Sequence, residues 1–383
     1  MISKIAQDIQ DSPTMAIGAK ARLLSQQGEK IIDLGVGYLD HEPPTALTQG
    51  LIKSLDKKNT GKYIATAGLT ELRKHIANKL TQQHGVSFAP EQILITSGAK
   101  SGVFLALTTI LNSGDEVIIQ APLWPSYTEQ IKIIGGIPVI IPATENCRLD
   151  IDAIEQKISP KTKAIIITSP NNPSGIVYNI DELQAIIQLA EKHDLYIISD
   201  EIYKDFTFDI QYPSISHIAN EQQRNHIIII DGFSKNIAIP WWRIGFVVAS
   251  IKVTNAAQKI LSNMMWNTSS IEQYALVELF EQWYDEAIQE LHTRIADNRK
   301  QVIDTLDEAN ISYIKPNGAL YFLIRIPTSN SIQFCDELLE NQKVVAIPGV
   351  YFWLEWYIRI CYATDIDTVK KGLQKIIEKI HQA

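Results

Sequence analysis

The stretch HIIIIDGFSKNIAIPWWRIGFVVA (His226–Ala249) joins two apolar runs through a segment that carries two cations, Lys235 and Arg243. The runs HIIII (His226–Ile230) and GFVVA (Gly245–Ala249) are short and rich in Ile and Val, which favours strands buried on both faces. Most Lys and Arg side chains lie in solvent, so the simplest interpretation of the two cations is a pair of surface charges. A functional interpretation needs support from the rest of the chain.

Five similar runs precede this stretch: QILIT (Gln92–Thr96), EVIIQ (Glu116–Gln120), IPVII (Ile137–Ile141), KAIIIT (Lys163–Thr168) and LYIIS (Leu195–Ser199). Segments with apolar residues at helical spacing lie among them, such as IDELQAIIQLAEKH (Ile180–His193). This alternation predicts an α/β fold with three layers, in which helices cover both faces of a mostly parallel seven-stranded sheet. The last run follows the sixth so closely that we expect the two to pair antiparallel.

A chain of 383 residues is long enough for two domains. We expect a large domain over residues 46–285. A second, smaller α/β domain is expected to combine residues 1–45 with residues 286–383. The helical periodicity of Ile271–Ala309 predicts a long helical connection between the two.

The composition excludes several classes of protein. The net charge of −8 gives no electrostatic footprint for nucleic acid or an anionic membrane, and no run of about twenty apolar residues exists that would span a bilayer. The N-terminus lacks the apolar core of a signal peptide. Three cysteines without a CxxC motif indicate free thiols in a reducing compartment. We therefore expect a cytoplasmic protein that acts on small molecules, with no nucleic-acid, membrane or metal partner.

Polar residues follow five of the predicted strands, in the segments SGAKSG, APLWPSY, SPNNPSG, DEIY and DGFSK. A single ending of this kind would be an ordinary turn. Ligands of open α/β sheets bind beyond the carboxyl ends of the strands, so five such endings indicate one shared site. The GxGxxG fingerprint of dinucleotide-binding proteins is absent after the first of these strands.

The residue types in these segments suggest the ligand. Small residues in SGAKSG would let backbone N–H groups approach an anion at a helix N-terminus, although a plain helix cap is equally compatible. Trp124 offers a face on which a ring could stack, or a packing side chain. The Asn172 amide could bind a phenolic oxygen.

Two charged residues at strand ends complete the pattern. Asp200, three residues before Tyr203, needs a cation if it is buried, and Lys235 needs to lose its charge, as it does in a Schiff base. Pyridoxal phosphate, with its phosphate, ring nitrogen, phenolic oxygen and aldehyde, would satisfy all of these groups.

Seven motifs in a fixed order extend this interpretation over nearly the whole chain. They are GVGYLDHEPP (Gly35–Pro44), KYIATAGLTELRKHIA (Lys62–Ala77), SPNNPSG, SDEIY, FSK with an Arg eight residues after the Lys, NGALYF (Asn317–Phe322) and YIRICYA (Tyr357–Ala363). The chain thereby resembles the class I aminotransferases of the fold-type I pyridoxal-phosphate enzymes, the aspartate aminotransferase superfamily. Each motif alone is weak, and the ordered set is specific.

The resemblance implies a role for each matching residue. Lys235 would form the Schiff base and move the α-proton, Asp200 would pair with the ring nitrogen, and Tyr203 with Asn172 would bind the phenolic oxygen. Trp124 would stack on the ring. The phosphate would be held by Gly98, Ala99, Lys100, Ser234 and Arg243, together with Tyr63 from the neighbouring subunit of a homodimer. Arg359 would clamp the substrate α-carboxylate, a task suited to a guanidinium, and Gly37 would lie in the loop that closes on the substrate. The substrate site would also include Lys100, Trp124 and Asn172.

The reaction implied is transfer of an amino group between an L-amino acid and a 2-oxo acid. In one bacterial subgroup with aspartate and prephenate activity, a lysine at the position of Lys100 binds the distal carboxylate of the substrate. An exposed lysine at a helix start is the alternative. The stretch NMMWNTSS (Asn263–Ser270) offers no second arginine that could bind a distal carboxylate, so an aromatic substrate is also compatible with the sequence. Glutamate and 2-oxoglutarate are the usual co-substrates.

Several positions depart from the family pattern. Trp241 replaces the usual glycine before WRIG, Gly232 replaces a small hydroxyl residue that binds phosphate, and the shortened loop Pro348–Ile360 has Trp353 and Trp356 in place of glycines. These bulky residues leave the identity of the substrate undetermined. Alternatively, they fill a repacked core.

Two other functions could use a chain of this kind. A β-lyase, decarboxylase or oxidase could use the same scaffold, because a fold does not fix a reaction. A regulator that senses an effector through this fold would need an N-terminal DNA-binding domain, for which the Gly-x-Gly segment beginning at Gly35 leaves no room.

Overall fold

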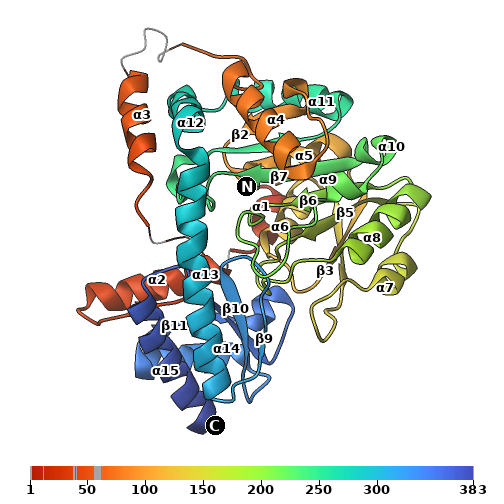
Figure 1. Cartoon of the computed structure of the whole chain (residues 1–383). Coiled ribbons are helices and arrows are strands. Elements are labelled where there is room, and N and C mark those ends of the chain that lie inside the picture. Colours follow the sequence, from red (N-terminus) through yellow and green to blue (C-terminus); the bar gives the residue numbers. More distant parts are fainter. Residues whose placement is uncertain (1, 12, 38, 40, 56–61, 383) are drawn as a thin grey trace.

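The computed structural model describes residues 2–11, 13–37, 39, 41–55 and 62–382, and Figure 1 shows the whole chain. Its largest sheet has seven strands in the order β2-β8-β7-β6-β5-β3-β4. Their bounds are β2 (Ile93–Thr96), β3 (Glu116–Gln120), β4 (Ile137–Ile141), β5 (Thr162–Thr168), β6 (Tyr196–Asp200), β7 (Ile227–Gly232) and β8 (Gly245–Val248).

The sheet is mostly parallel, as the alternating pattern predicts. Strands β4, β3, β5, β6 and β7 pair parallel to one another, and β8 pairs antiparallel with both β7 and β2. Six of these seven strands therefore share one direction, and the antiparallel pairing expected for the last run is confirmed.

Both faces of this sheet are buried, because successive side chains of a strand point to opposite sides. On β7, Ile227 and Ile229 belong to one core cluster, while Ile228 and Ile230 belong to another. The first cluster includes side chains of α4 (Thr70–His84), α8 (Ile180–Lys192) and α12 (Ser270–Gln282), and the second those of α5 (Ala99–Ile110) and α6 (Ser126–Ile133). The three-layer arrangement is confirmed.

A second region, drawn at the bottom of Figure 1, contains a four-stranded sheet in the order β12-β13-β10-β9 and a two-stranded sheet of β1 with β11. The bounds are β1 (Ile32–Asp33), β9 (Tyr313–Ile314), β10 (Tyr321–Arg325), β11 (Val344–Val345), β12 (Ile347–Pro348) and β13 (Tyr357–Cys361). Because β1 pairs with β11, an N-terminal segment lies beside the C-terminal part of the chain. The domain boundaries at residues 45 and 285 stay a prediction.

The remaining helices are α1 (Lys4–Asp8), α2 (Pro13–Gln26), α3 (Thr45–Leu55), α7 (Ile151–Gln156), α9 (Ile215–Ile218), α10 (Glu221–Arg224), α11 (Ile251–Met265), α13 (Tyr284–Glu308), α14 (Ser331–Gln342) and α15 (Ile366–Gln382). Short 3-10 turns cover Pro90–Gln92, Pro240–Trp242 and Gly349–Phe352. No helix in the described part of the chain is both long and apolar enough to cross a membrane.

The stretch Ile271–Ala309 forms two helices, α12 and α13, separated at Trp283, whose φ of −142° leaves the helical region. Its neighbour Tyr284 stacks on Phe280 with 3.9 Å between ring centroids and accepts a hydrogen bond from Asn236. The Asn236 hydrogen bond ties the start of α13 to the segment after β7, and helical periodicity does not reveal the break. The longer helix α13 runs from the large sheet to the second region in Figure 1.

Two facing glycines allow β7 and β8 to approach the start of α5. A Cβ on Gly245 would lie 2.5 Å from the backbone nitrogen of Ala99, and a Cβ on Gly232 would lie 2.9 Å from the Cα of Gly245. The close packing at Gly232 explains why a hydroxyl residue does not occupy this position. It also fixes the N-terminal end of α5 against the strand.

We expect Gly245→Ala to lower the free energy of unfolding by about 1–3 kcal/mol, because the backbone atoms it meets cannot move aside as a flexible side chain can. Urea denaturation measures the loss. Gly18→Ala is the matched control, since a Cβ there meets nothing closer than an Arg22 nitrogen at 3.6 Å inside α2. It should raise stability by roughly 0.5–1 kcal/mol. Unchanged stability in Gly245→Ala would show that the contact relaxes without cost.

Candidate active site

Lys235 lies three residues beyond the end of β7, inside the cluster of residues that the sequence singles out. Its amine donates a hydrogen bond to the carbonyl of Gly37 and lies 5.8 Å from the centroid of the Tyr203 ring. The pKa of Lys235 is lowered to about 8, chiefly by burial and also by the charges of Arg359 and Arg243, whereas Cys361 and Asp200 act in the opposite direction. A useful fraction of this amine is therefore unprotonated near neutral pH.

Asp200 is the last residue of β6 and is only 4% exposed. Its Oδ2 accepts a hydrogen bond of 2.7 Å from the Tyr127 hydroxyl, which also lies 2.8 Å from Thr168 Oγ1, and its Oδ1 accepts from the backbone N–H of Ile202. Burial raises the pKa of Asp200 to about 6, although these hydrogen bonds oppose the shift. Such a carboxylate is set to pair with a cation that enters the site.

Tyr203 and Tyr321 connect this carboxylate region to the N-terminal segment. Their hydroxyl groups lie 2.8 Å apart, and the Tyr321 hydroxyl donates a longer hydrogen bond, 3.4 Å, to the carbonyl of Gly37. Burial raises the pKa of Tyr203 well above its ordinary value and that of Tyr321 to about 12, so both are neutral phenols. The Gly37 carbonyl therefore receives donors from both Lys235 and Tyr321.

Arg359, on β13, lies 3% exposed between two aromatic rings. Its Cζ is 4.5 Å from the ring centroid of Tyr321 and 5.0 Å from that of Phe352. One terminal nitrogen donates to Asn172 Oδ1 at 3.1 Å and the other to the Gly35 carbonyl at 2.8 Å. Among the described residues its buried Nε has no hydrogen-bond partner. A guanidinium held in this way can bind a carboxylate.

An anion could be held at the N-terminus of α5. Gly98, at φ +80°, caps the helix, and the backbone N–H groups of Ala99 and Lys100 follow in its first turn. Arg243 donates hydrogen bonds to the carbonyls of Ser97 and Pro240. A Cβ at Gly98 would lie 2.5 Å from an Arg243 nitrogen, so glycine is what allows the guanidinium to lie here. Helix N–H groups beside a guanidinium form a site suited to phosphate.

Lys100 and Trp124 lie together at this end of the sheet. The Lys100 amine is 5.1 Å from the centroid of the Trp124 ring, which packs edge-on against Tyr127 at 5.2 Å. Burial and then the charge of Arg243 lower the pKa of Lys100. Ser234, next to Lys235 in the chain, is buried.

Tyr63 is the residue that the single chain does not bring into this cluster. It is 81% exposed, and its ring packs against that of Trp266 at 5.5 Å between centroids. The suggestion that the unusual tryptophans fill a core is wrong for Trp241, which is 80% exposed, and Trp353 and Trp356 are also on the surface.

Three residues that the sequence did not single out contribute to the geometry: Tyr127, Tyr321 and Phe352. Tyr127 and Tyr321 stand within the quoted segments APLWPSY and NGALYF, so their place after a strand or within a motif was the available signal. The contact of Phe352 with Arg359 joins a 3-10 turn to β13 and has no such signal.

The donor set fits pyridoxal phosphate on the observations above. The neutral form of Lys235 suits a carbonyl carbon, the buried Asp200 suits a protonated ring nitrogen, and the start of α5 with Arg243 suits a phosphate. The unpaired Nε of Arg359 leaves a donor for a substrate carboxylate.

Comparison with known proteins agrees with this chemistry. Residues 29–376 match the family model described as aminotransferase class I and II. The chain is 32% identical to an aspartate aminotransferase of Thermotoga maritima, with 98% of each chain covered, and 31% identical to an aspartate/prephenate aminotransferase of Thermus thermophilus, covering 100% of this chain and 99% of the relative. The solved Thermus thermophilus aspartate aminotransferase with maleate superposes with a TM-score of 0.93 at 29% identity, with 99% of each chain covered.

The burial of Asp200 leads to a prediction about stability in protein freed of cofactor. Because the pKa of Asp200 is raised to about 6 on folding, the folded state holds this proton more tightly, and stability falls as the pH rises from about 4 to about 6. Asp200→Asn avoids the buried charge. We expect it to be more stable than the parent at about pH 7, by on the order of 1–3 kcal/mol, and not at about pH 4.

Urea denaturation at the two pH values measures this difference. Asp152→Asn, at an exposed residue in the first turn of α7, is the control: it removes a charge that favours a helix N-terminus, so at about pH 7 it should lower stability by less than about 1 kcal/mol, opposite in sign to the change at position 200. A variant at position 200 that is less stable than the parent at both pH values would contradict the assigned cost of the buried carboxylate.

Proposed function

The chain belongs to the class I and II aminotransferase family, whose members depend on pyridoxal phosphate, and we propose on that premise that it acts on L-amino acids of the aspartate class. The enzyme is an aminotransferase that moves an amino group between an amino acid and a 2-oxo acid. In this proposal the amino acid substrate has a second carboxylate, and the 2-oxo acid is of the 2-oxoglutarate type. The supporting observation is the placement of Lys100, an exposed residue in the first turn of α5 whose amine lies 5.1 Å from the centroid of the Trp124 ring.

The proposed roles follow from the geometry of the site. Lys235 would attach the cofactor through its amine, and Asp200 would keep the ring nitrogen protonated, because a buried carboxylate is stabilised by an adjacent cation. Tyr203 and Asn172 would bind the phenolic oxygen, and Trp124 would stack on the ring. The start of α5, Ser234 and Arg243 would hold the phosphate.

When bound, pyridoxal phosphate supplies a carbon that bonds to amines and an electron-poor ring that stabilises negative charge at the substrate α-carbon. Lys235 would act as the base in this proposal: once the incoming amino group has displaced its amine from the cofactor, that amine, whose pKa is lowered to about 8, would take the proton from the substrate α-carbon and deliver it to the cofactor's reactive carbon. Arg359 binds the α-carboxylate through its unpaired Nε and holds the substrate in one orientation. The segment at Gly37 closes over the site through its contacts with Lys235 and Tyr321.

An aromatic amino acid is the second candidate substrate. The rings of Tyr321 and Phe352 flank Arg359 and would offer apolar contacts. A structurally similar protein of Methanococcus jannaschii, with a TM-score of 0.90, 32% identity, and 99% of this chain and 100% of that chain covered, is described as similar in its active site to kynurenine aminotransferases.

A homodimer is part of the proposal. A second copy would cover exposed apolar side chains, among them Trp266, whose ring lies 5.5 Å from that of Tyr63, and Leu55, Met264, Met265 and Trp241. Tyr63 would reach the phosphate held by its partner. We also propose a cytoplasmic location, which the buried free thiols of Cys147, Cys335 and Cys361 support and cell fractionation would check.

The substrate class is tested by the half-reaction in which an amino acid alone changes the visible absorbance of the bound cofactor. We expect aspartate to convert the parent protein stoichiometrically. In Lys100→Met, conversion by aspartate should slow by about 10- to 100-fold, because a charge-assisted contact is lost, while conversion by phenylalanine changes less than about threefold.

Lys157→Met, at an exposed lysine, is the matched control and should leave both rates unchanged. Cofactor occupancy, read from the same spectra, must stay equal among the variants. Equal losses with aspartate and phenylalanine would remove Lys100 as the determinant, and a faster reaction of the parent with phenylalanine would favour the aromatic class. Release of ammonia together with pyruvate would indicate a lyase.

The dimer is tested by mixing two inactive variants, Tyr63→Ala and Lys235→Ala. If Tyr63 serves the partner's site, a mixed dimer regains one complete site, and equal amounts of randomly assembled subunits should recover about a quarter of the parental activity per subunit. If Tyr63 serves its own chain, mixing restores nothing. Sedimentation velocity confirms that the mixed species are dimers.

A further inference from the structure

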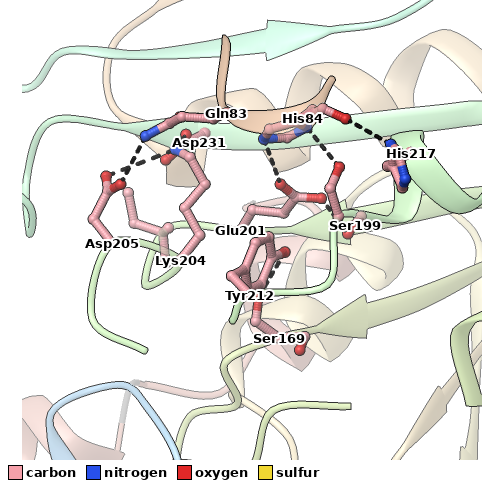
Figure 2. A network of polar contacts seen from close by, with 12 residues as sticks. Gln83, His84, Ser169, Ser199, Glu201, Lys204, Asp205, Tyr212, His217 and Asp231 are labelled. Carbon is pink, nitrogen blue, oxygen red and sulfur yellow. Dashed lines mark hydrogen bonds and ion pairs between the residues drawn. The ribbon is translucent and has the colours of Figure 1, made fainter. Parts of the chain in front are cut away.

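A buried polar cluster lies beside the proposed active site, where β6 and β7 end (Figure 2). Four of its residues come from the two segments that carry the proposed catalytic groups: Lys204, Asp205, Asp231 and Asn236. In the chain, Lys204 directly follows Tyr203, and Asn236 directly follows Lys235. The cluster thus involves the immediate neighbours of two proposed catalytic residues.

The first connection is an ion pair between the two strand exits. The amine of Lys204 donates to Oδ2 of Asp231 and lies 3.8 Å from Oδ2 of Asp205. The side chains of Lys204 and Asp231 are only 7% and 2% exposed. Burial by itself would lower the pKa of Lys204, but the charges of Asp205 and Asp231 outweigh it and raise that pKa, so the amine stays charged. The other carboxylate oxygen of Asp231 accepts from the Gly232 N–H at 2.7 Å.

The second connection is a hydrogen bond of 2.8 Å from the Asn236 amide to Oδ2 of Asp205. The same amide donates to the Tyr284 hydroxyl at 3.1 Å, at the start of α13. Gln83, at the end of α4, donates to the other oxygen of Asp205 at 3.2 Å. Two helices therefore fix the position of the connection between the exits of β6 and β7.

The other titratable groups around Lys204 carry little charge near neutral pH. Burial raises the pKa of Glu201 to about 8 and lowers that of His84 to about 3, and these two side chains face each other at 3.9 Å. Burial also raises the pKa values of Tyr212 and Tyr284 well above their ordinary values. Asp205 and Asp231 are thus the charges that hold Lys204.

We propose that Lys204, Asp205, Asp231 and Asn236 are positioning residues that fix Lys235 relative to Asp200 and Tyr203. None of the four is proposed to touch cofactor or substrate. The ion pair holds the ends of β6 and β7 together, and the Asp205–Asn236 hydrogen bond holds the residue next to Lys235. A buried ion pair is weak evidence for added stability, since apolar residues often serve equally well, so a positioning role accounts better for its presence.

This inference rests on the proposed role of Lys235 as the cofactor-binding lysine. The readout is the pH midpoint at which the visible band of the bound cofactor changes in the resting enzyme, because this midpoint depends on the surroundings of the Lys235 nitrogen. A missing band in the parent would count against the role of Lys235. A band that is present but insensitive to the variants would count against the positioning role alone.

Asn236→Ala is the first variant. We expect the midpoint to move by at least about half a pH unit, and kcat to fall about tenfold while KM for the amino acid stays within about threefold, because a small displacement of Lys235 affects the chemical step more than binding. Asn255→Ala is the matched control, since Asn255 is an exposed residue of α11 outside the stretch Asn263–Ser270. It should change neither quantity.

The double variant Lys204→Met with Asp231→Asn guards against simple misfolding, because it removes one positive and one negative charge together and leaves Asp205 with its amide donors Asn236 and Gln83. We expect its melting temperature to exceed that of either single variant, while its midpoint stays displaced. Lys192→Met, which breaks an exposed ion pair with Glu155, is its control. Midpoints within about 0.2 pH units of the parent in both Asn236→Ala and the folded double variant would overturn the proposal.

Discussion

The cost of holding charged groups out of water at the ends of the parallel strands governs this structure. Asp200, Lys235 and Arg359 are each placed where few water molecules can reach them, and each is only partly satisfied by protein atoms. In response, the pKa of Asp200 is raised and that of Lys235 is lowered, so the neutral form of each group becomes more populated. An entering ligand that brings the complementary charges relieves this cost, so the free energy of burial becomes free energy of binding.

The same constraint explains why the surrounding residues are small or neutral. Gly98 and Gly245 keep backbone N–H groups and a guanidinium close together, and a single added carbon at either would collide with its neighbours. Tyr127 and Tyr203 supply hydroxyl groups that remain protonated and add no further charge. The electrostatic properties of such a site depend on the absence of further charges as much as on the charged groups that are present.

Much of the fold follows from short-range pattern. The Ile-rich runs predict the strands of the large sheet to within a residue or two, because strands buried on both faces consist almost entirely of apolar residues. The polar segments after those strands predict which residues meet, because the carboxyl ends of parallel strands share one edge. The placement of Lys235 beside Tyr203 agrees with that prediction, whereas the roles of these residues remain proposals.

What the sequence does not reveal depends on contacts between distant segments. The helix break at Trp283 is accompanied by a hydrogen bond from Asn236 to Tyr284, and the pairing of Lys204 with Asp231 depends on the register of β6 with β7. A lysine and an aspartate 27 residues apart carry no local signal of their contact. Such pairs become visible only when the topology is known.

The reversed direction of β8 has a further consequence for how the site is assembled. The other six strands of the large sheet deliver their carboxyl ends to the active-site edge, whereas β8 begins there, two residues after Arg243. A strand in the common direction would place that arginine at the far edge, about 13 Å away for a strand of this length. One inverted strand thus lets a residue that precedes a strand meet residues that follow strands. Lys235, which follows β7, and Arg243, which precedes β8, can therefore lie at the same edge of the sheet although they are within a dozen residues of each other in the chain.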